Sequence, residues 1–383
     1  MTRFQIVLLT ATLIDLATSA LVLRRVTGRN RLNAGTPPRL GVADVLVVVA
    51  AGTISFAVKL PVLVALGVGL FGVLHLVYAD LAISAPVLAV LTVWWTRAGH
   101  VQRARATAPV RALSLLCLAA APVAVYASFV EPHRLQLRRA EVIFDRTGEH
   151  DGSIKVVVLS DFQFSRVTSY EREVVRRALA QRPDLILMPG DVLQGGAAVY
   201  MSQAADTHDL LAQLTAPGGV FLVMGDVDRL GWLRKLVAGT RVRLLLNDVV
   251  LTQVGDLSVA VGGIQTRYRS LGAGRTVTTL EQTPADLRIL LSHRPDIALE
   301  LTADSPIDMV IAGHTHGGQV QIPGFGPLIT ATRVPRAVAA GGLHDLNGRP
   351  IYVSRGIGME RGQAPPIRLF CRPELTVLTL HVE

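Results

Sequence analysis

The sequence predicts a bundle of apolar N-terminal helices followed by a single α/β domain. Half of its 383 residues are hydrophobic, and the mean hydropathy of +0.42 is higher than soluble chains of this length usually have. Four long apolar runs fall before residue 130, whereas short β-branched runs alternate with helical stretches after it. The length allows two domains, and two cysteines in different contexts exclude a disulfide framework.

Each apolar run reaches roughly the 20 residues that cross the hydrocarbon core of a bilayer. The first run lacks the layout of a cleavable secretory signal, so we expect it to be retained. The third is either one tilted helix or two short helices joined near Tyr78–Asp80. The expected spans are 4–23, 42–58, 60–95 and 112–130. They form a transmembrane region over residues 1–130, followed by a linker with a leading strand (131–153) and the α/β domain (154–383).

The positive charge of the chain belongs to the membrane region. Residues 1–130 carry 11 Lys/Arg and 3 Asp/Glu, whereas the remainder is nearly neutral, so a nucleic-acid partner is not expected. The loops Arg24–Arg39 and Arg97–Arg111 hold five and four arginines without an acid, and the positive-inside rule places both in the cytoplasm. A single crossing within the third run then puts the C-terminal domain outside the cytoplasm. A hairpin in that run would reverse this.

Three acids, Asp15, Asp44 and Asp80, lie in or beside the apolar runs. Ionisable residues inside a membrane can mark a polar pathway, which is the basis of a transporter-like interpretation. We favour the simpler interpretation, in which these acids face neighbouring helices or the lipid headgroups.

The α/β domain begins near Leu135. Its expected strands are 155–159, 184–188, 220–224, 257–262, 288–291, 309–311, 351–353 and 374–380. Its expected helices are 169–181, 202–214, a segment just after Asp228, and 295–301, which starts with proline at the first helical position. Several strands end in polar or glycine-bearing turns, and open α/β sheets bind ligands at those carboxyl ends.

Five strand ends carry side chains that can bind metal ions. They are SDFQ at 160–163, GD at 190–191, GDVD at 225–228, His293, and GHTH at 313–316. Mixed carboxylate and imidazole ligands suit Mn, Fe or Zn better than Ca or Mg. His314 and His316 alternate along an extended segment, so each can reach a separate ion. Each turn alone is a weak signal, but the ordered series predicts a centre of one or two divalent ions that clamps phosphate and activates water.

This series resembles the calcineurin-like metallophosphoesterases, most closely their membrane-anchored bacterial branch. The family's blocks D-x-H, G-D, G-N-H-D, H and G-H-x-H read here SDFQ, PGD, MGDVD, LLSH and AGHTHGGQV. The tail IYVSRGIG…IRLFCRPELTVLTL is also similar, so the resemblance covers about residues 155–380. It implies a four-layer α/β/β/α sandwich with a two-metal phosphoesterase site between its sheets.

The resemblance also implies two ligand sets bridged by Asp191. The first set would be Asp161, Gln163, Asp191 and His316, and the second Asp191, Asp226, His293 and His314. Gln163 replaces the usual histidine and is a weaker ligand for Mn, Fe or Zn. Asp226 replaces the usual asparagine and keeps an oxygen ligand.

Val227 is the larger departure, because the family has there the histidine that polarises the phosphate or protonates the leaving group. Valine can do neither, and Asp228, which assists that histidine in the family, is left as the candidate catalytic residue. General acid catalysis is worth about 10²–10⁴-fold, so substrates whose leaving group needs no proton are favoured. Both departures fit either a one-metal mechanism or relaxed selection.

The favoured function is therefore a membrane-anchored, metal-dependent phosphoesterase acting on a phosphate mono- or diester. The anchor makes a lipid or envelope phosphate a candidate substrate. A degenerate fold that binds metal or ligand as a sensor module is the main alternative, and a transporter-like or structural membrane protein is the third. The sequence has no P-loop or nucleophile-elbow motif. The oligomeric state stays open.

Overall fold

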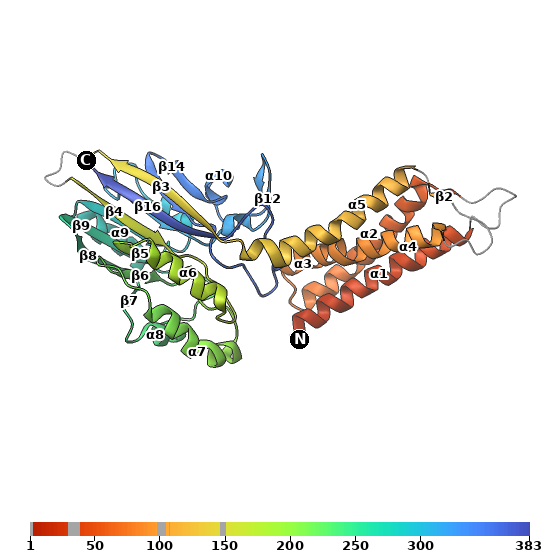
Figure 1. Ribbon diagram of the computed structural model, residues 1–383, viewed down its shortest axis with the longest axis horizontal. Helices are drawn as coiled ribbons and strands as arrows, with labels where there is room; N and C mark the ends of the chain where they lie inside the picture. The colour runs from red at the N-terminus through yellow and green to blue at the C-terminus, as the bar shows by residue number, and fades with distance from the viewer. Residues whose placement is uncertain (1–2, 30–38, 98–104, 107, 146–150) are drawn as a thin grey trace. The chain divides into compact units, whose positions relative to one another are not determined.

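The computed structural model describes residues 3–29, 39–97, 105–106, 108–145 and 151–383 (Figure 1). The chain divides into two compact units. The helical unit comprises Met1–Ser128 together with the short segment Arg361–Pro366. The α/β unit comprises Phe129–Glu360 and Ile367–Glu383.

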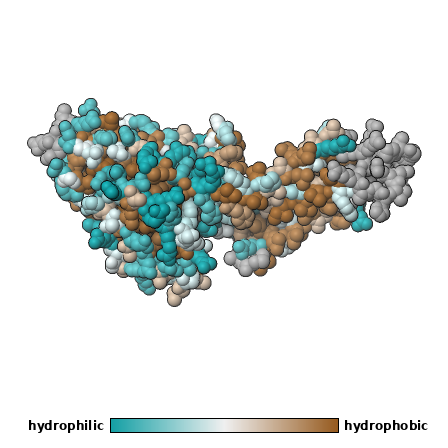
Figure 2. Space-filling view, in the orientation of Figure 1, coloured by the Kyte–Doolittle hydropathy of each residue, from teal (hydrophilic) through white to brown (hydrophobic). Residues whose placement is uncertain are grey.

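Long apolar helices build the helical unit. They are α1 (Arg3–Arg29), α2 (Val42–Ala65), α3 (Leu70–Ala79), the π-helical turn η1 (Asp80–Ser84), α4 (Ala85–Arg97) and α5 (Ala108–Val125), with the short strands β1 (Arg39–Leu40) and β2 (Arg105–Ala106). Four stretches are long and apolar enough to cross a membrane: Arg3–Val26, Val42–Ala65, Leu70–Trp94 and Ala108–His133. Hydrophobic residues cover most of the visible face of these helices (Figure 2), as expected for spans whose partner is lipid.

The break between the second and third stretches lies at Leu66–Gly69 and not at Lys59–Pro61. α2 continues past Pro61, whose ring removes one intrahelical hydrogen bond without ending this long apolar helix. From Leu70 to Arg97 the chain is one continuous helical run through η1, so it offers one candidate crossing and no hairpin. The two arginine-rich loops lie partly outside the described residues.

Each of the three acids of this region has a local partner. Asp15 forms an ion pair with Lys59. Asp44 accepts a hydrogen bond of 2.8 Å from a backbone amide at the start of α2, and Asp80 accepts one of 3.0 Å from Ser84 across η1. These contacts within the helical unit agree with the simpler interpretation of the acids.

The segment Arg361–Pro366 belongs to the helical unit although it comes from the far end of the sequence. The Gln363 side chain donates to Gly67 O and accepts from Gly69 N, both at 2.7 Å. Its backbone oxygen lies 3.2 Å from His75 Nδ1. These hydrogen bonds hold the turn between α2 and α3.

Two six-stranded sheets form the centre of the α/β unit. The first has the order β3 (Gln136–Phe144), β16 (Glu374–Val382), β4 (Gly152–Val158), β5 (Leu185–Met188), β6 (Val220–Val223), β7 (Val242–Leu245). The second has the order β14 (Gly342–Leu346), β15 (Arg349–Val353), β11 (Met309–Ala312), β10 (Leu287–Ser292), β9 (Leu257–Ile264), β8 (Asp248–Val254). A separate antiparallel pair consists of β12 (Gln321–Ile322) and β13 (Gly326–Pro327).

Parallel strands occupy the middle of both sheets. β4 to β7 run parallel in the first sheet, and β9, β10, β11 and β15 run parallel in the second. Strands β16, β8 and β14 pair antiparallel with β4, β9 and β15. Because neighbouring parallel strands end at the same edge of a sheet, the turns after β4, β5 and β6 lie together, as do those after β10 and β11.

Helices cover the outer face of each sheet. α6 (Ser169–Ala180), α7 (Ala197–Ala212) and α8 (Leu230–Val237) pack on the first sheet, and α9 (Leu271–Gln282), η4 (Pro295–Leu299) and α10 (Arg336–Ala339) pack on the second. A further cluster of buried aliphatic and aromatic side chains from both sheets fills the space between them. The unit is thus the expected four-layer α/β/β/α sandwich.

All eight expected strands are present, with shifted ends, and the expected helix at 295–301 is the 3₁₀ helix η4. Within the α/β unit, strands β7, β8, β12, β13 and β14 and helices α9 and α10 were not predicted from the sequence. The sequence of α9, LGAGRTVTTLEQ, combines two glycines with four β-branched residues and has low helix propensity. The helix forms because Ser270 caps it, accepting from Ala273 N at 3.1 Å, and because Leu280 is buried against the sheet.

Candidate metal centre

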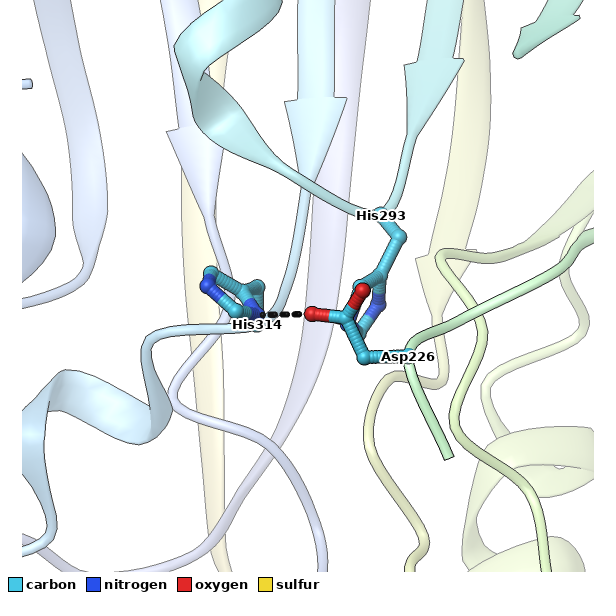
Figure 3. A group of neighbouring side chains, drawn as sticks. All are labelled: Asp226, His293 and His314. Atoms are coloured by element: carbon cyan, nitrogen blue, oxygen red, sulfur yellow. Dashed lines mark ion pairs between the residues drawn. The ribbon is translucent and has the colours of Figure 1, made fainter. Parts of the chain in front are cut away.

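The metal-ligand turns predicted from the sequence converge in the α/β unit. The three aspartates Asp161, Asp191 and Asp226 follow β4, β5 and β6, and the three histidines His293, His314 and His316 follow β10 and β11. Figure 3 shows the Asp226 carboxylate beside the imidazoles of His293 and His314. Side chains from both sheets, separated by 67 to 155 residues in sequence, therefore meet in one place.

Within the part of the chain that the structure describes, two groups of three ligand atoms lie close enough to hold an ion. In the first, Asp226, His293 and His314 place their ligand atoms within 4.8 Å of one another, and His314 Nδ1 lies 3.0 Å from Asp226 Oδ2. In the second group, the ligand atoms of Asp161, Asp191 and His293 also lie within 4.8 Å of one another. His293 Nε2 lies 3.4 Å from Asp191 Oδ2, so His293 belongs to both groups.

His316 and Gln163 lie beside the second group. His316 Nε2 is 3.6 Å from Asp161 Oδ1, and Gln163 Nε2 donates to Asp191 Oδ2 at 2.7 Å. All seven residues predicted as ligands are therefore found in this region. Their role as ligands stays a prediction.

The two buried histidines are arranged as metal ligands usually are. His293 Nδ1 lies 2.8 Å from the carbonyl oxygen of Pro189, which fixes the ring proton on Nδ1 and leaves a lone pair on Nε2. Among the described residues, Nε2 of His293 and of His316 has no hydrogen-bond partner. A buried ring nitrogen without a partner is costly unless a ligand satisfies it.

The backbone at the centre is held in an unusual conformation. Positive φ angles of 50°, 38°, 58°, 71° and 50° occur at the non-glycine residues Asp161, Gln163, Asp191, His314 and His316. Residues with a Cβ rarely adopt this region, and such strain clusters at functional sites because surrounding structure must maintain it. The clustering is independent of any resemblance and points to the same residues.

Glycines allow the turns to approach closely. A Cβ at Gly313 would lie 2.3 Å from Asp161 Oδ2, and a Cβ at Gly225 would lie 2.1 Å from Asp191 Oδ1. Real Cβ atoms do not come this close to an oxygen. The glycine of each block is therefore required by the carboxylate of the neighbouring turn.

Burial dominates the electrostatics of the centre. It raises the pKa of Asp161 to about 6 and, together with neighbouring Asp228, raises the pKa of Asp191 well above its usual value. Burial also lowers the pKa of His293 and of His316. A divalent cation favours ionised carboxylates and neutral imidazoles, which are the ligand forms of both groups.

The pKa values of Asp226 and His314 shift in the directions opposite to those of the buried aspartates and histidines. Burial acts to raise the pKa of Asp226, but the hydrogen bond from His314 and the neighbouring cationic groups lower it below its usual value. Against the effect of burial, the same hydrogen bond raises the pKa of His314. This carboxylate is the most exposed of the three, with its side chain 31% exposed, and it faces the open side of the centre.

Asp228 supports the backbone of the centre. Its carboxylate accepts from the backbone amides of Asp191, Val192 and Gly225 at 2.8, 3.0 and 2.9 Å. Three amide donors hold the turn that carries Asp191 against the turn that carries Asp226. These bonds make Asp228 a positioning residue, and a direct catalytic role for it stays a prediction.

Arg294 forms an ion pair with Asp226, the residue that precedes Val227, and was not selected from the sequence. Its Nη2 and Nε contact the two oxygens of Asp226 at 2.8 and 3.3 Å. The Arg294 side chain is 37% exposed. Val227 contributes only its backbone amide, which donates to Asp191 Oδ1 at 2.8 Å. The sequence signal that could have indicated Arg294 is its position directly after His293.

Two further residues around the centre were not selected from the sequence, although Arg368 lies in the similar tail segment. The guanidinium of Arg368 is fully buried, donates to the carbonyl oxygens of Arg355 and Cys371, and lies 3.5 Å from His316 Nδ1. Glu360 Oε2 accepts from Gln163 Nε2 at 3.0 Å. Both belong to the closing segment that leads into β16, and only the fold brings them to the turns.

The donor set fits a divalent transition metal. Carboxylates with neutral imidazoles suit Mn, Fe or Zn, and the unpartnered Nε2 atoms, the strained turns and the close glycines are all features of a rigid ligand cradle.

Comparisons with known proteins agree with this geometry. Residues 154–318 match the model of the calcineurin-like phosphoesterase family. The metallophosphoesterase YkuE of Bacillus subtilis is 31% identical over 272 residues, which cover 67% of this chain and 88% of YkuE. The phosphodiesterase YaeI of Escherichia coli is 29% identical over 266 residues, covering 67% of this chain and 92% of YaeI.

A third relative carries a more specific name. UDP-2,3-diacylglucosamine pyrophosphatase LpxG of Chlamydia muridarum is 23% identical over 331 residues, covering 70% of this chain and 96% of LpxG. The resemblance drawn from the strand-end blocks is confirmed. This chain belongs to the calcineurin-like metallophosphoesterase family.

Proposed function

We propose that this protein is a membrane-anchored, metal-dependent phosphoesterase that hydrolyses phosphate diesters or anhydrides of lipid-linked or envelope molecules. The observation that carries the proposal is the convergence of three carboxylates, two of them buried, and three imidazoles on strand-end turns, four of these six residues having positive φ. Four apolar helices, each long enough to cross a bilayer, supply the anchor.

The residues of the centre divide into holding and positioning roles. Asp191, Asp226, His293 and His314 would hold a divalent ion, which supplies Lewis-acid activation of the phosphate and of the attacking water. Asp228 keeps the two aspartate turns together through backbone amides. Arg294 places a guanidinium beside Asp226, where the N–H groups not used in that ion pair can bind a phosphate oxygen.

Because valine replaces the usual histidine at position 227, the range of favoured substrates is narrower. An arginine remains protonated at any working pH, so Arg294 can stabilise charge on phosphate but cannot donate a proton to a leaving group. A leaving group that is itself a phosphate or another weak base needs no proton. Anhydrides and aryl esters are therefore favoured over alkyl esters, because an alkyl diester releases an alkoxide just as an alkyl monoester does. The name of LpxG, a pyrophosphatase acting on a diacylated sugar nucleotide, supports an anhydride substrate, and the name of YaeI, a phosphodiesterase, supports a diester.

We also propose that the α/β unit lies outside the cytoplasm. Four spans with both arginine-rich loops on the cytoplasmic side place everything after the fourth span on the opposite side. A phosphatase reporter fused after Glu383 would be active, whereas the same reporter inserted after Arg29 would be inactive. The reverse pattern would contradict this orientation.

A degenerate, non-catalytic member that binds metal as a sensor is the second candidate. Gln163 and Val227, which replace two usual histidines, favour it. Turnover of bis-p-nitrophenyl phosphate and p-nitrophenyl phosphate by the full-length chain in detergent, with Mn²⁺, separates the two candidates. We expect diester turnover that a His314→Ala variant lacks. If the unaltered chain binds metal but its turnover does not exceed that of His314→Ala, the result favours the sensor function.

A further inference from the structure

The carboxamide of Gln163 lies between two carboxylates. Its Nε2 donates to Asp191 Oδ2 at 2.7 Å and to Glu360 Oε2 at 3.0 Å. Carboxylates only accept hydrogen bonds, so this network orients the amide with its N–H₂ group toward both of them. Gln163 and Asp191 are 1% and 2% exposed, so the two bonds form in a buried setting where they are strong.

Other side chains hold Glu360 in this position. Its Oε1 accepts from Gln194 Nε2 at 2.7 Å, and its backbone amide donates to Gln319 Oε1 at 2.6 Å. The glutamate is thus fixed from two further sides, and its second oxygen is directed at Gln163. Two carboxylates joined by a hydrogen-bond donor are the arrangement in which a cation would otherwise be expected.

The two candidate ligand groups compete for one atom. Both include His293, whose Nδ1 is committed to Pro189 O, so only the single lone pair on Nε2 is available. One imidazole lone pair coordinates one ion. Among the described residues, neither group retains three ligands at this spacing without His293, and neither includes His316 or Glu360.

We propose that each chain binds a single divalent ion, at Asp191, Asp226, His293 and His314, and that the Gln163 carboxamide takes the structural place of a second ion by bridging Asp191 and Glu360. This inference rests on the proposed function, because it presupposes a metal centre. Under this proposal, Glu360 is the hydrogen-bond acceptor for the carboxamide that replaces histidine at position 163.

Metal content tests the inference directly. The full-length chain in detergent is stripped with a chelator, reloaded with Mn²⁺, freed of excess metal, and analysed by elemental analysis and by electron paramagnetic resonance. We expect one Mn²⁺ per chain with the spectrum of an isolated ion. His293→Ala is expected to bind none, because both groups lose their shared ligand. Gln163→His is expected to bind two ions with the spectrum of a coupled pair, whereas the matched surface variant Gln253→His keeps one.

The possible metal contents distinguish failure of the single-ion proposal from failure of the proposed phosphoesterase function. Two ions in the unaltered chain, or one ion retained by a folded His293→Ala variant, would overturn the single-ion proposal and leave the phosphoesterase proposal standing. No bound ion in the unaltered chain would overturn both. Circular dichroism of each variant shows whether it is folded. If His293→Ala does not fold, the comparison of Gln163→His with Gln253→His still decides, because one ion in both would overturn the proposal.

Discussion

Replacing Asp228 with alanine tests whether this residue positions the centre or takes part in the reaction directly. Its carboxylate accepts hydrogen bonds from three backbone amides in the turns that carry Asp191 and Asp226. Each buried amide left without an acceptor costs about 1–3 kcal/mol. Three of them predict a loss of at least about 3 kcal/mol in the free energy of unfolding of the α/β unit. For a unit of this size that is a fall in melting temperature of about 6–12 °C.

The assay is thermal unfolding of the full-length chain in detergent, followed by tryptophan fluorescence, with Mn²⁺ affinity measured in parallel. Because the turns carry ligands, we expect Asp228→Ala to weaken metal binding by about 10–100-fold. Asp206→Ala is the matched control, since Asp206 is half exposed and forms a surface ion pair with Arg172. Its removal should change stability by less than about 1 kcal/mol.

The two roles of Asp228 predict different results. An Asp228→Asn or Asp228→Ala variant that keeps its melting temperature and its metal affinity, yet loses turnover, would refute the positioning argument. That result would instead support the catalytic role expected from the sequence.

Three other substitutions give further checks. Gly313→Ala forces a Cβ against a buried carboxylate and should abolish metal binding, whereas Gly274→Ala, which meets no atom within 4 Å in a helix, should be neutral or stabilising by up to about 1 kcal/mol. Arg294→Ala should lower kcat/KM for diesters by about 10–100-fold, mainly through KM, and Arg294→Lys should recover part of it; a change in kcat alone would contradict phosphate binding. Lys59→Met should destabilise the helical unit by about 3–5 kcal/mol by leaving Asp15 unpaired, and detergent melting curves should show recovery in the Lys59→Met/Asp15→Asn double variant.

The strand-end ligands could be predicted from the sequence because their signal is local. Strands such as β5 and β11 are short buried runs, LILM and MVIA, and the chemistry follows each of them within a few residues. Parallel neighbours end at one edge, so ordered turns imply convergence without any knowledge of distances. The four-layer sandwich then follows from the resemblance of the same turns.

The remaining features depend on contacts between distant residues. Gln363 joins the helical unit by hydrogen bonds to Gly67 and Gly69. No local sequence pattern around these residues indicates a contact between positions nearly three hundred residues apart. Helix α9 forms against its own propensity because the sheet buries one of its faces. In the same way, Asp228 looks like a catalytic acid in sequence because its hydrogen bonds to backbone amides are visible only in three dimensions.

Two of the three departures from the family pattern, Asp226 and Gln163, have a partner in the structure that offsets the change. The carboxylate at Asp226 adds negative charge to a half-buried site, and Arg294 offsets it with a two-pronged ion pair. The carboxamide of Gln163 adds buried donors, and Glu360 accepts from one of them. Drift in an unused site would leave such groups unpaired, at a cost of about 1–3 kcal/mol for each. Paired replacements instead favour a site that was rebuilt for a narrower reaction with one ion and an arginine.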